Sequence, residues 1–474
     1  MHGFRARLDY ILKHNYAINR IFNWMASSFM KVWGYFIPLD DEMVIFSGHT
    51  RRYNDSPRTL YEYMLAHPEK FGRYKCVWAL EDPENVDIPG NPIKVKSDTP
   101  KYFKYTLKAK YWVTCVNIER SLHYKKRKCR YLNTWHGTAF KHIGNDAGVR
   151  KDFDFSSVDY FCYASEYEKK IYMNAFRTRE DAMIPTGLPR NDELYHVTPN
   201  EIGSLKDKLG LPRDKKIILY APTWRESTDN GKTCAIKPPI NTKKWETELK
   251  DNYIILFRMH AYTNQLLGLE FNDTIRDYSA YPNVNDLFKV ADILISDYSA
   301  SMSDYAILER PVLCFTYDYE QYRDERGLYL DFDKDMPSGI LRTEDDVLKY
   351  IKNMDYEKEC EKTRIMIKEK LIHFIGNSLF TEVSRGAGGR ACVFATSNYG
   401  HKPGECGIIQ PFNTMLPLLW MIAMEGRMTV EINREDETGW FVGLLDWLGI
   451  NSGRNTEKIT LSSEADKKHY LCNI

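Results

Sequence analysis

Short apolar runs alternate with longer stretches of helical periodicity along most of the chain. In the first half, the apolar runs predict buried β-strands at Met43–Phe46, Tyr74–Leu80, Ile93–Val95 and Tyr111–Val116. The stretches between them predict helices near Thr59–His67 and Pro100–Ala109. Strands that alternate with helices form parallel sheets covered on both faces, so this pattern predicts an α/β domain.

The same alternation starts again in the second half. Further strands are predicted at Lys216–Tyr220, Tyr253–Phe257, Ile293–Ile295 and Val312–Phe315. Between the halves, residues 183–192 carry two prolines and a glycine, which interrupt the pattern. A chain of 474 residues is also longer than a domain with a single hydrophobic core usually is. We therefore expect two α/β domains, at residues 41–190 and 191–380, with a cleft between them and an unassigned tail at 381–474 that includes an apolar segment at 415–424.

Polar residues follow the predicted strands of the second half at the point where each strand ends. Trp224 and Arg225 follow the first of these strands, Arg258 and His260 follow the second, and a serine-rich turn at 296–301 follows the third. Carboxyl ends of parallel strands meet at one edge of a sheet, where open α/β folds bind ligands. The second half therefore has a candidate ligand site at this edge.

In the first half, His136 stands between a short predicted strand and Gly137. A lone histidine is more often structural than catalytic. A histidine at the carboxyl end of a strand, followed by a glycine that lets a ligand approach the backbone, is a better catalytic candidate.

Residues 1–40 differ from the rest of the chain. An apolar stripe with helical spacing runs through Ile18, Phe22, Met25, Phe29, Val32 and Phe36. Polar residues within the stretch argue against a membrane span, whereas the flanking tryptophans and cations suit a helix lying in a membrane interface. The alternative is a helix packed on the protein's own core, and the sequence leaves both interpretations open.

Charge and cysteine content narrow the classes of partner and compartment. The 66 Lys and Arg nearly balance 65 Asp and Glu, so net charge indicates no polyanionic partner. A basic run at 120–130 is compatible with a solvated loop, anionic lipid or a polyphosphate acceptor, but it lacks the interleaved aromatics of a nucleic-acid site. The ten cysteines show no metal-binding spacing and no cleavable signal peptide is visible, which indicates a cytoplasmic protein.

A series of motifs links these features to a known family. In order along the chain they are TWHGTAFKHIG at 134–144, TGLPRND at 186–192, YAPTWR at 220–225, RMH at 258–260, SDYSASMSDY at 296–305 and ERPVLCFTYDYEQYRDERGLYLDF at 309–332. With these motifs the chain resembles the CDP-glycerol glycerophosphotransferase family, which includes teichoic acid and capsule polymerases and primases. The resemblance suits the GT-B architecture of two Rossmann-like domains around a cleft. It implies transfer of glycerol phosphate or ribitol phosphate from a CDP-alditol at the cytoplasmic face of the membrane.

The resemblance also implies roles for individual residues. The family's HGT histidine matches His136, which is implied as general base. The family's donor-binding positions match Gly137, Thr138, Arg190, Trp224, Arg225, Arg258, His260, Ser299 and Asp304. The family usually has Lys-Pro-His where this chain has Arg258-Met-His260, and two serines where it has Ser299-Ala300, with Ser301 as a replacement hydroxyl. These departures leave the donor open between glycerol and ribitol, and the motifs separate neither primase from polymerase nor teichoic acid from capsule.

The residue types suit the implied chemistry. An acceptor hydroxyl would attack the β-phosphorus of the CDP-alditol and CMP would leave. A histidine with a pKa near about 6.5 can take the hydroxyl proton, and arginines can neutralise a pyrophosphate. No paired carboxylates stand near the motifs, so we expect no metal or cofactor besides the donor. Expected partners are a lipid-linked polymer acceptor and an anionic membrane surface, with no nucleic acid. The alternatives are a nucleotide-sugar glycosyltransferase and a catalytically idle polymer-binding protein of the same fold.

Overall fold

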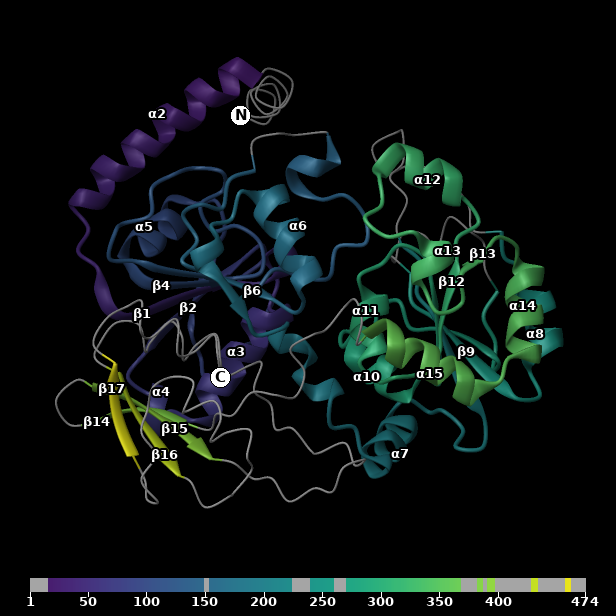
Figure 1. Cartoon of the computed structure of the whole chain (residues 1–474). Coiled ribbons are helices and arrows are strands. Elements are labelled where there is room, and N and C mark those ends of the chain that lie inside the picture. The colour runs from purple at the N-terminus through teal and green to yellow at the C-terminus, as the bar shows by residue number, and fades with distance from the viewer. Residues whose placement is uncertain are drawn as a thin grey trace.

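Two parallel β-sheets, each with helices on both faces, form the body of the protein (Figure 1). The computed structural model describes residues 16–148, 153–223, 239–259 and 270–367, together with strands β14 (Glu382–Gly386), β15 (Arg390–Thr396), β16 (Met428–Asn433) and β17 (Glu457–Leu461). The predicted α/β class with two Rossmann-like units is confirmed.

The first sheet has the order β3-β2-β1-β4-β5-β6-β7, and all neighbouring strands are parallel. Its strands are β1 (Asp40–Ser47), β2 (Lys75–Leu80), β3 (Ile93–Lys96), β4 (Ala109–Thr114), β5 (Arg130–Asn133), β6 (Tyr160–Tyr163) and β7 (Met183–Pro185). Successive residues of β1 face opposite sides, so Met43 and Ile45 enter one core while Val44 and Phe46 enter the other. Burial on both faces explains why this strand is a continuous apolar run.

Helices α3 (Asp55–Ala66), α4 (Pro68–Phe71), α5 (Pro100–Lys108) and α6 (Glu166–Phe176) accompany the first sheet. Two of these helices, α5 and α6, begin at a side-chain cap. The Thr99 hydroxyl accepts the Tyr102 N–H at the start of α5, and the Ser165 hydroxyl accepts the Glu168 N–H at the start of α6. Short 3₁₀ turns complete this half at η1 (His49–Arg51), η2 (Gly144–Ala147), η3 (Glu180–Ala182) and η4 (Pro189–Leu194).

The second sheet has the order β10-β9-β8-β11-β12-β13 and is also parallel. Its strands are β8 (Lys216–Tyr220), β9 (Tyr253–Phe257), β10 (Ile275–Asp277), β11 (Ile293–Ser296), β12 (Val312–Phe315) and β13 (Ile340–Leu341). Its helices are α7 (Pro199–Lys208), α8 (Thr242–Leu249), α10 (Val284–Val290), α11 (Ser301–Ala306), α12 (Tyr319–Arg326), α13 (Phe332–Asp335), α14 (Glu344–Asn353) and α15 (Tyr356–Met366). Strands β9, β8 and β11 are neighbours, which confirms that the three predicted strands end at one edge.

Helix α2 (Tyr16–Tyr35) runs along the outside of the first sheet's helices and has two different faces (Figure 1). On the inner face, Met30 is buried in the first core and the Ser27 hydroxyl accepts the His123 N–H at 3.0 Å. On the outer face, Trp24 is 70% exposed and Phe29 is 67% exposed. Among the described helices, none is long and apolar enough to span a bilayer.

The basic run at 120–130 is partly tied into the first half of the chain. The Arg120 side chain pairs with Asp98 at 2.9 Å, and Lys125 pairs with Asp159 at 2.9 Å. The Lys126 ammonium donates to the Ile37 carbonyl that follows α2. These three cations therefore have structural partners, while Arg127 and Lys128 are exposed.

The tail that the sequence left unassigned contributes a third sheet, with the order β14-β15-β16-β17. Strands β15 and β16 are parallel, and the outer strands pair with them in antiparallel fashion. The apolar segment at 415–424 lies outside the described residues.

Candidate active site at the junction of the two sheets

Three neighbouring strands of the first sheet deliver the residues around His136. Strands β1, β4 and β5 are adjacent, and His49, Cys115 and His136 follow them at the same edge. The Thr134 N–H donates to the Thr114 carbonyl at 2.8 Å, so the strand ends remain joined beyond the ladder. At this edge the rings of His49 and His136 lie 4.7 Å apart.

The protonation state of His136 follows from its contacts. Its Nδ1 lies 2.7 Å from the Cys115 carbonyl oxygen, and because a carbonyl only accepts, we assign the ring proton to Nδ1. The pKa of His136 is lowered to about 4, chiefly by burial and also by His49 and Arg190, against the opposing influence of the Cys115 carbonyl and Asp55. The ring is therefore neutral near pH 7. No described residue hydrogen-bonds to Nε2, whose lone pair can accept a proton.

Gly137 and Thr138 are held closely where the two halves meet. Gly137 has φ 142°, and a Cβ there would lie 2.6 Å from the Ala300 Cβ of the second half. The Thr138 hydroxyl donates to the Glu168 carboxylate at 2.6 Å, and the Ala164 N–H donates to the same carboxylate at 2.6 Å. Burial raises the pKa of Glu168. These contacts fix the turn that carries His136.

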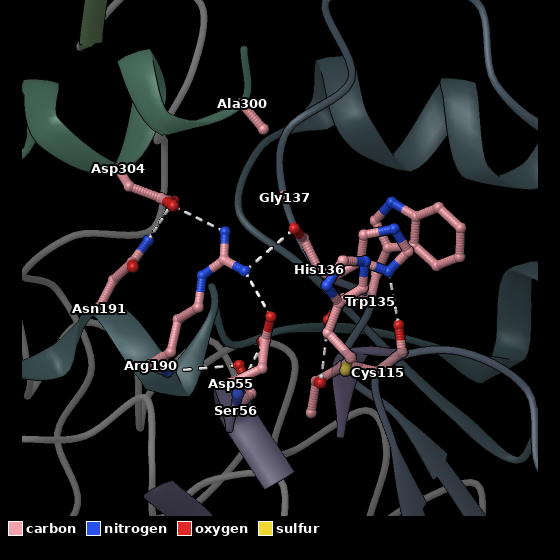
Figure 2. A network of polar contacts seen from close by, with 12 residues as sticks. Asp55, Ser56, Cys115, Trp135, His136, Gly137, Arg190, Asn191, Ala300 and Asp304 are labelled. Atoms are coloured by element: carbon pink, nitrogen blue, oxygen red, sulfur yellow. Dashed lines mark hydrogen bonds and ion pairs between the residues drawn. The ribbon is translucent and has the colours of Figure 1, made fainter. Parts of the chain in front are cut away.

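Arg190 joins the two halves through a buried ion-pair network (Figure 2). Its Nη1 donates to Asp55 at 2.7 Å and to the His136 carbonyl at 3.0 Å, while Nη2 donates to Asp304 at 2.6 Å. Asn191 donates to the other Asp304 oxygen at 2.7 Å. Burial raises the pKa of Asp304, and the two carboxylates raise the pKa of Arg190 although burial acts against it. Arg190 thus holds α3, α11 and the histidine turn together.

A second contact links the halves beside this network. Lys141 and Leu328 form an antiparallel bridge, and the Tyr329 N–H donates to the Phe140 carbonyl at 2.9 Å. The Tyr329 hydroxyl donates to Asp146 at 2.6 Å, and Phe140 is buried in the core of the second half. These contacts and Arg190 place the edge that carries His136 against the second sheet.

The second sheet contributes Arg258, Ser299 and Ser301 at its carboxyl edge. The Arg258 Nη1 donates to the Tyr281 carbonyl at 2.5 Å, and burial lowers the pKa of its guanidinium. The hydroxyls of Ser299 and Ser301 lie 2.5 Å apart beside Ala300. Trp224, Arg225 and His260 lie outside the described residues.

The structure brings some of the predicted site residues together. Others of them already form hydrogen bonds or ion pairs with protein groups. His136, Gly137, Arg190 and Asp304 meet at the junction (Figure 2). Thr138, Arg190 and Asp304 are already bound to protein groups, so for these residues the observed contacts are positioning contacts and donor binding stays a prediction.

His49 and Asp55 are not among the site residues predicted from the sequence. His49 carried a usable signal, because it follows Gly48 at the end of a predicted strand. Asp55 carried none, since its partner Arg190 lies 135 residues further along the chain. In the described part of the chain, no group of three or more His, Cys, Asp or Glu residues is arranged to hold a metal ion.

The chain is similar to a family of known proteins. The family described as CDP-Glycerol:Poly(glycerophosphate) glycerophosphotransferase matches residues 29–375. The teichoic acid glycerol-phosphate transferase of Staphylococcus aureus is 32% identical over 328 residues, which cover 65% of this chain and 82% of that protein. The teichoic acid poly(glycerol phosphate) polymerase of Staphylococcus epidermidis is 34% identical over 324 residues, which cover 64% of this chain but only 44% of the polymerase.

Solved structures show the same fold. The wall teichoic acid polymerase TagF superposes with a TM-score of 0.65 at 30% identity, covering 78% of this chain and 93% of that one. A TagF variant soaked with CDPG superposes with a TM-score of 0.62 at 30% identity, covering 70% of this chain and 85% of that one.

Proposed function

This chain belongs to the CDP-glycerol:poly(glycerophosphate) glycerophosphotransferase family, and we propose that it transfers glycerol phosphate or ribitol phosphate from a CDP-alditol to a hydroxyl of a membrane-linked wall or capsule polymer. It is an enzyme of the CDP-glycerol glycerophosphotransferase kind. The family relationship supports the donor class, and the geometry around His136 supports the mechanism.

The observation that carries the proposal is the protonation state of His136 at the junction of the two sheets. Its Nδ1–H is held by the Cys115 carbonyl, and burial keeps the ring neutral, so Nε2 is a base without a described partner. The acceptor oxygen forms a bond to the β-phosphorus while its proton passes to Nε2. The bond from that phosphorus to the CMP oxygen breaks, and CMP leaves with the electron pair.

The donor is assigned to the second half. Arg258, Ser299 and Ser301 line the carboxyl edge of the second sheet, next to the junction with Gly137. The TagF variant soaked with CDPG supports a CDP-alditol as donor for this chain. Arginine and serine groups supply charge and hydrogen bonds to a pyrophosphate, and we propose that no metal or other cofactor is required.

We assign acceptor binding to the first half of the chain, and we propose that α2 contacts the membrane. The outer face of α2 exposes Trp24, Phe29 and Val32. The exposed Arg127 and Lys128 directly follow Lys126, whose ammonium donates to the carbonyl of Ile37 just after α2. Exposed aromatic and aliphatic side chains near cations suit an anionic lipid surface. We place the enzyme peripherally at the cytoplasmic face of the membrane, where it meets a lipid-linked acceptor.

The test is a donor screen with purified full-length protein and a lipid-linked glycerol-phosphate acceptor. CDP-glycerol, CDP-ribitol and UDP-sugars are offered separately, and nucleotide release and product length are followed. CMP release that depends on acceptor, from either CDP-alditol, is the expected result. Consumption of a UDP-sugar alone would identify a glycosyltransferase, and consumption of no donor would identify an idle polymer-binding protein; either result overturns the proposal.

A further inference from the structure

His49 is a second histidine at the junction to which the proposed reaction gives no role. It follows β1 through Gly48, and its ring lies 4.7 Å from the His136 ring at a tilt of 34°. In the described structure no hydrogen bond joins the two rings, so the contact is ring against ring. At this separation a proton on one imidazole strongly affects the other.

The loop that carries His49 is held in an uncommon backbone conformation. Thr50, Arg51 and Asp55 have φ of 52°, 60° and 60°, in the left-handed region that non-glycine residues seldom adopt. Arg51 is fixed by an ion pair with Asp98 at 2.8 Å. Such conformations concentrate at functional sites, and here the loop sets the His49 ring against His136.

The charged groups around the pair favour His49 as the first of the two rings to take a proton. Burial is the largest cause that lowers the pKa of both histidines, and for His136 the net shift is large, to about 4. Asp55 raises the pKa of His49, whereas Arg190 and Arg52 lower it. For His136, the positive charge of a protonated His49 is the largest lowering influence after burial.

Resting on the proposed function, we propose that His49 is a positioning residue for the transfer, which takes the first proton that reaches the histidine pair and so keeps Nε2 of His136 free. As pH falls, a protonated His49 repels a second proton from His136. The general base therefore remains available at lower pH than an isolated histidine would. The hydroxyl proton still passes to Nε2 of His136 and then to solvent, and no bond to His49 is formed.

The first arm of the test needs no substrate, so it is independent of the proposed function. Full-length protein labelled at histidine Cε1 is titrated by NMR in wild-type, His49→Phe and His49→Gln forms, with His136→Gln used for assignment. Phe keeps a ring over His136 without a titrating group. We expect His49 to titrate at higher pH than His136, and the His136 midpoint to rise by about one pH unit or more in both His49 variants, as Coulomb's law gives for charges at this separation. An unchanged midpoint, or His136 titrating first, overturns the proposal.

The second arm follows kcat/KM for the CDP-alditol against pH. The acid limb is expected to move to higher pH in His49→Phe and His49→Gln, with the same displacement as the NMR midpoint. His67→Phe is the matched control, because the His67 ring also lies on an aromatic ring, that of Tyr63 at 4.1 Å, and its profile stays unchanged. An acid limb that does not move overturns the proposal. If no CDP-alditol is consumed but the NMR midpoint of His136 moves, the proposed function is wrong while the coupling of the two histidines is supported.

Discussion

Gly137 of the first half and Ala300 of the second half lie so close that a Cβ on Gly137 would stand 2.6 Å from the Cβ of Ala300. Real Cβ atoms do not approach this closely, so the glycine permits the contact between the halves. The glycine also has φ 142°, which L side chains rarely adopt. The relationship ties the turn that carries His136 to the turn that carries Ser299 and Ser301.

We therefore expect Gly137→Ala to lower both melting temperature and donor turnover. Gly148→Ala is the matched control, because Gly148 also has positive φ, at 75°, but has nothing within 4 Å of its added Cβ. Differential scanning calorimetry and CMP release measure the two effects. Adding Ala300→Gly to Gly137→Ala removes the opposing Cβ and should recover part of the loss. If the two glycine substitutions had equal effects, backbone strain at positive φ would explain both of them. That result would contradict a role for the close approach of Gly137 to Ala300.

Arg190 should be essential for stability, because it neutralises two buried carboxylates. Arg190→Ala leaves Asp55 and Asp304 without their counter-charge, and breaking a buried ion pair in this way costs roughly 3–5 kcal/mol. We expect a clear fall in melting temperature, partly reversed by adding Asp304→Asn. Arg213→Ala, which removes an exposed pair with Asp207, should leave the melting temperature unchanged. Equal melting temperatures for the two arginine variants would contradict the inter-sheet role of Arg190.

The two sheets were largely predictable from the sequence, whereas the network around Arg190 was not. Strands such as β9 are continuous apolar runs buried on both faces, so Tyr253–Phe257 begins and ends where the pattern predicts. Strand β13 consists only of Ile340–Leu341, too short to leave a pattern. His136 was found because it follows a strand and precedes glycine.

The role of Asp55 depends on tertiary structure instead, because its partner Arg190 lies far along the chain. The same holds for Thr138, whose hydroxyl has a buried carboxylate partner in α6. The local sequence pattern shows where polar residues gather at a sheet edge. It does not show which of these residues pair with other protein groups and which remain available to a ligand.

Membrane association should depend on the outer face of α2. Trp24→Glu and Phe29→Glu place a charge on this exposed face, and each should weaken binding to vesicles that contain anionic phospholipid by about tenfold, the loss expected for one large apolar side chain. Substitution is cleaner than deleting residues 1–38, because Met30 is part of the core. Leu65→Glu on α3 is the control, since Leu65 is a 38% exposed apolar residue elsewhere in the first half, and its binding should not change. Vesicle sedimentation with equal binding by all variants would assign the anchor to another part of the chain.

Chelation of divalent metals should leave substantial turnover, since the proposed charge clamp consists of arginines such as Arg258, together with the candidates Arg225 and His260. The measurement is CMP release after extensive treatment with EDTA, with circular dichroism as the check on folding. A strict requirement for added Mg²⁺ in protein that remains folded would contradict a clamp made of side chains alone.

The most direct measurement compares acceptor-dependent CMP release from CDP-glycerol by wild type, His136→Ala and His136→Gln, with CDP-glycerol affinity measured in parallel by calorimetry. His67→Ala serves as a control histidine. A general base contributes about 10²- to 10⁴-fold, so we predict a loss of that size in both His136 variants with donor affinity within a few-fold of wild type. Full activity in both His136 variants, or a loss confined to donor affinity, would contradict His136 as the base.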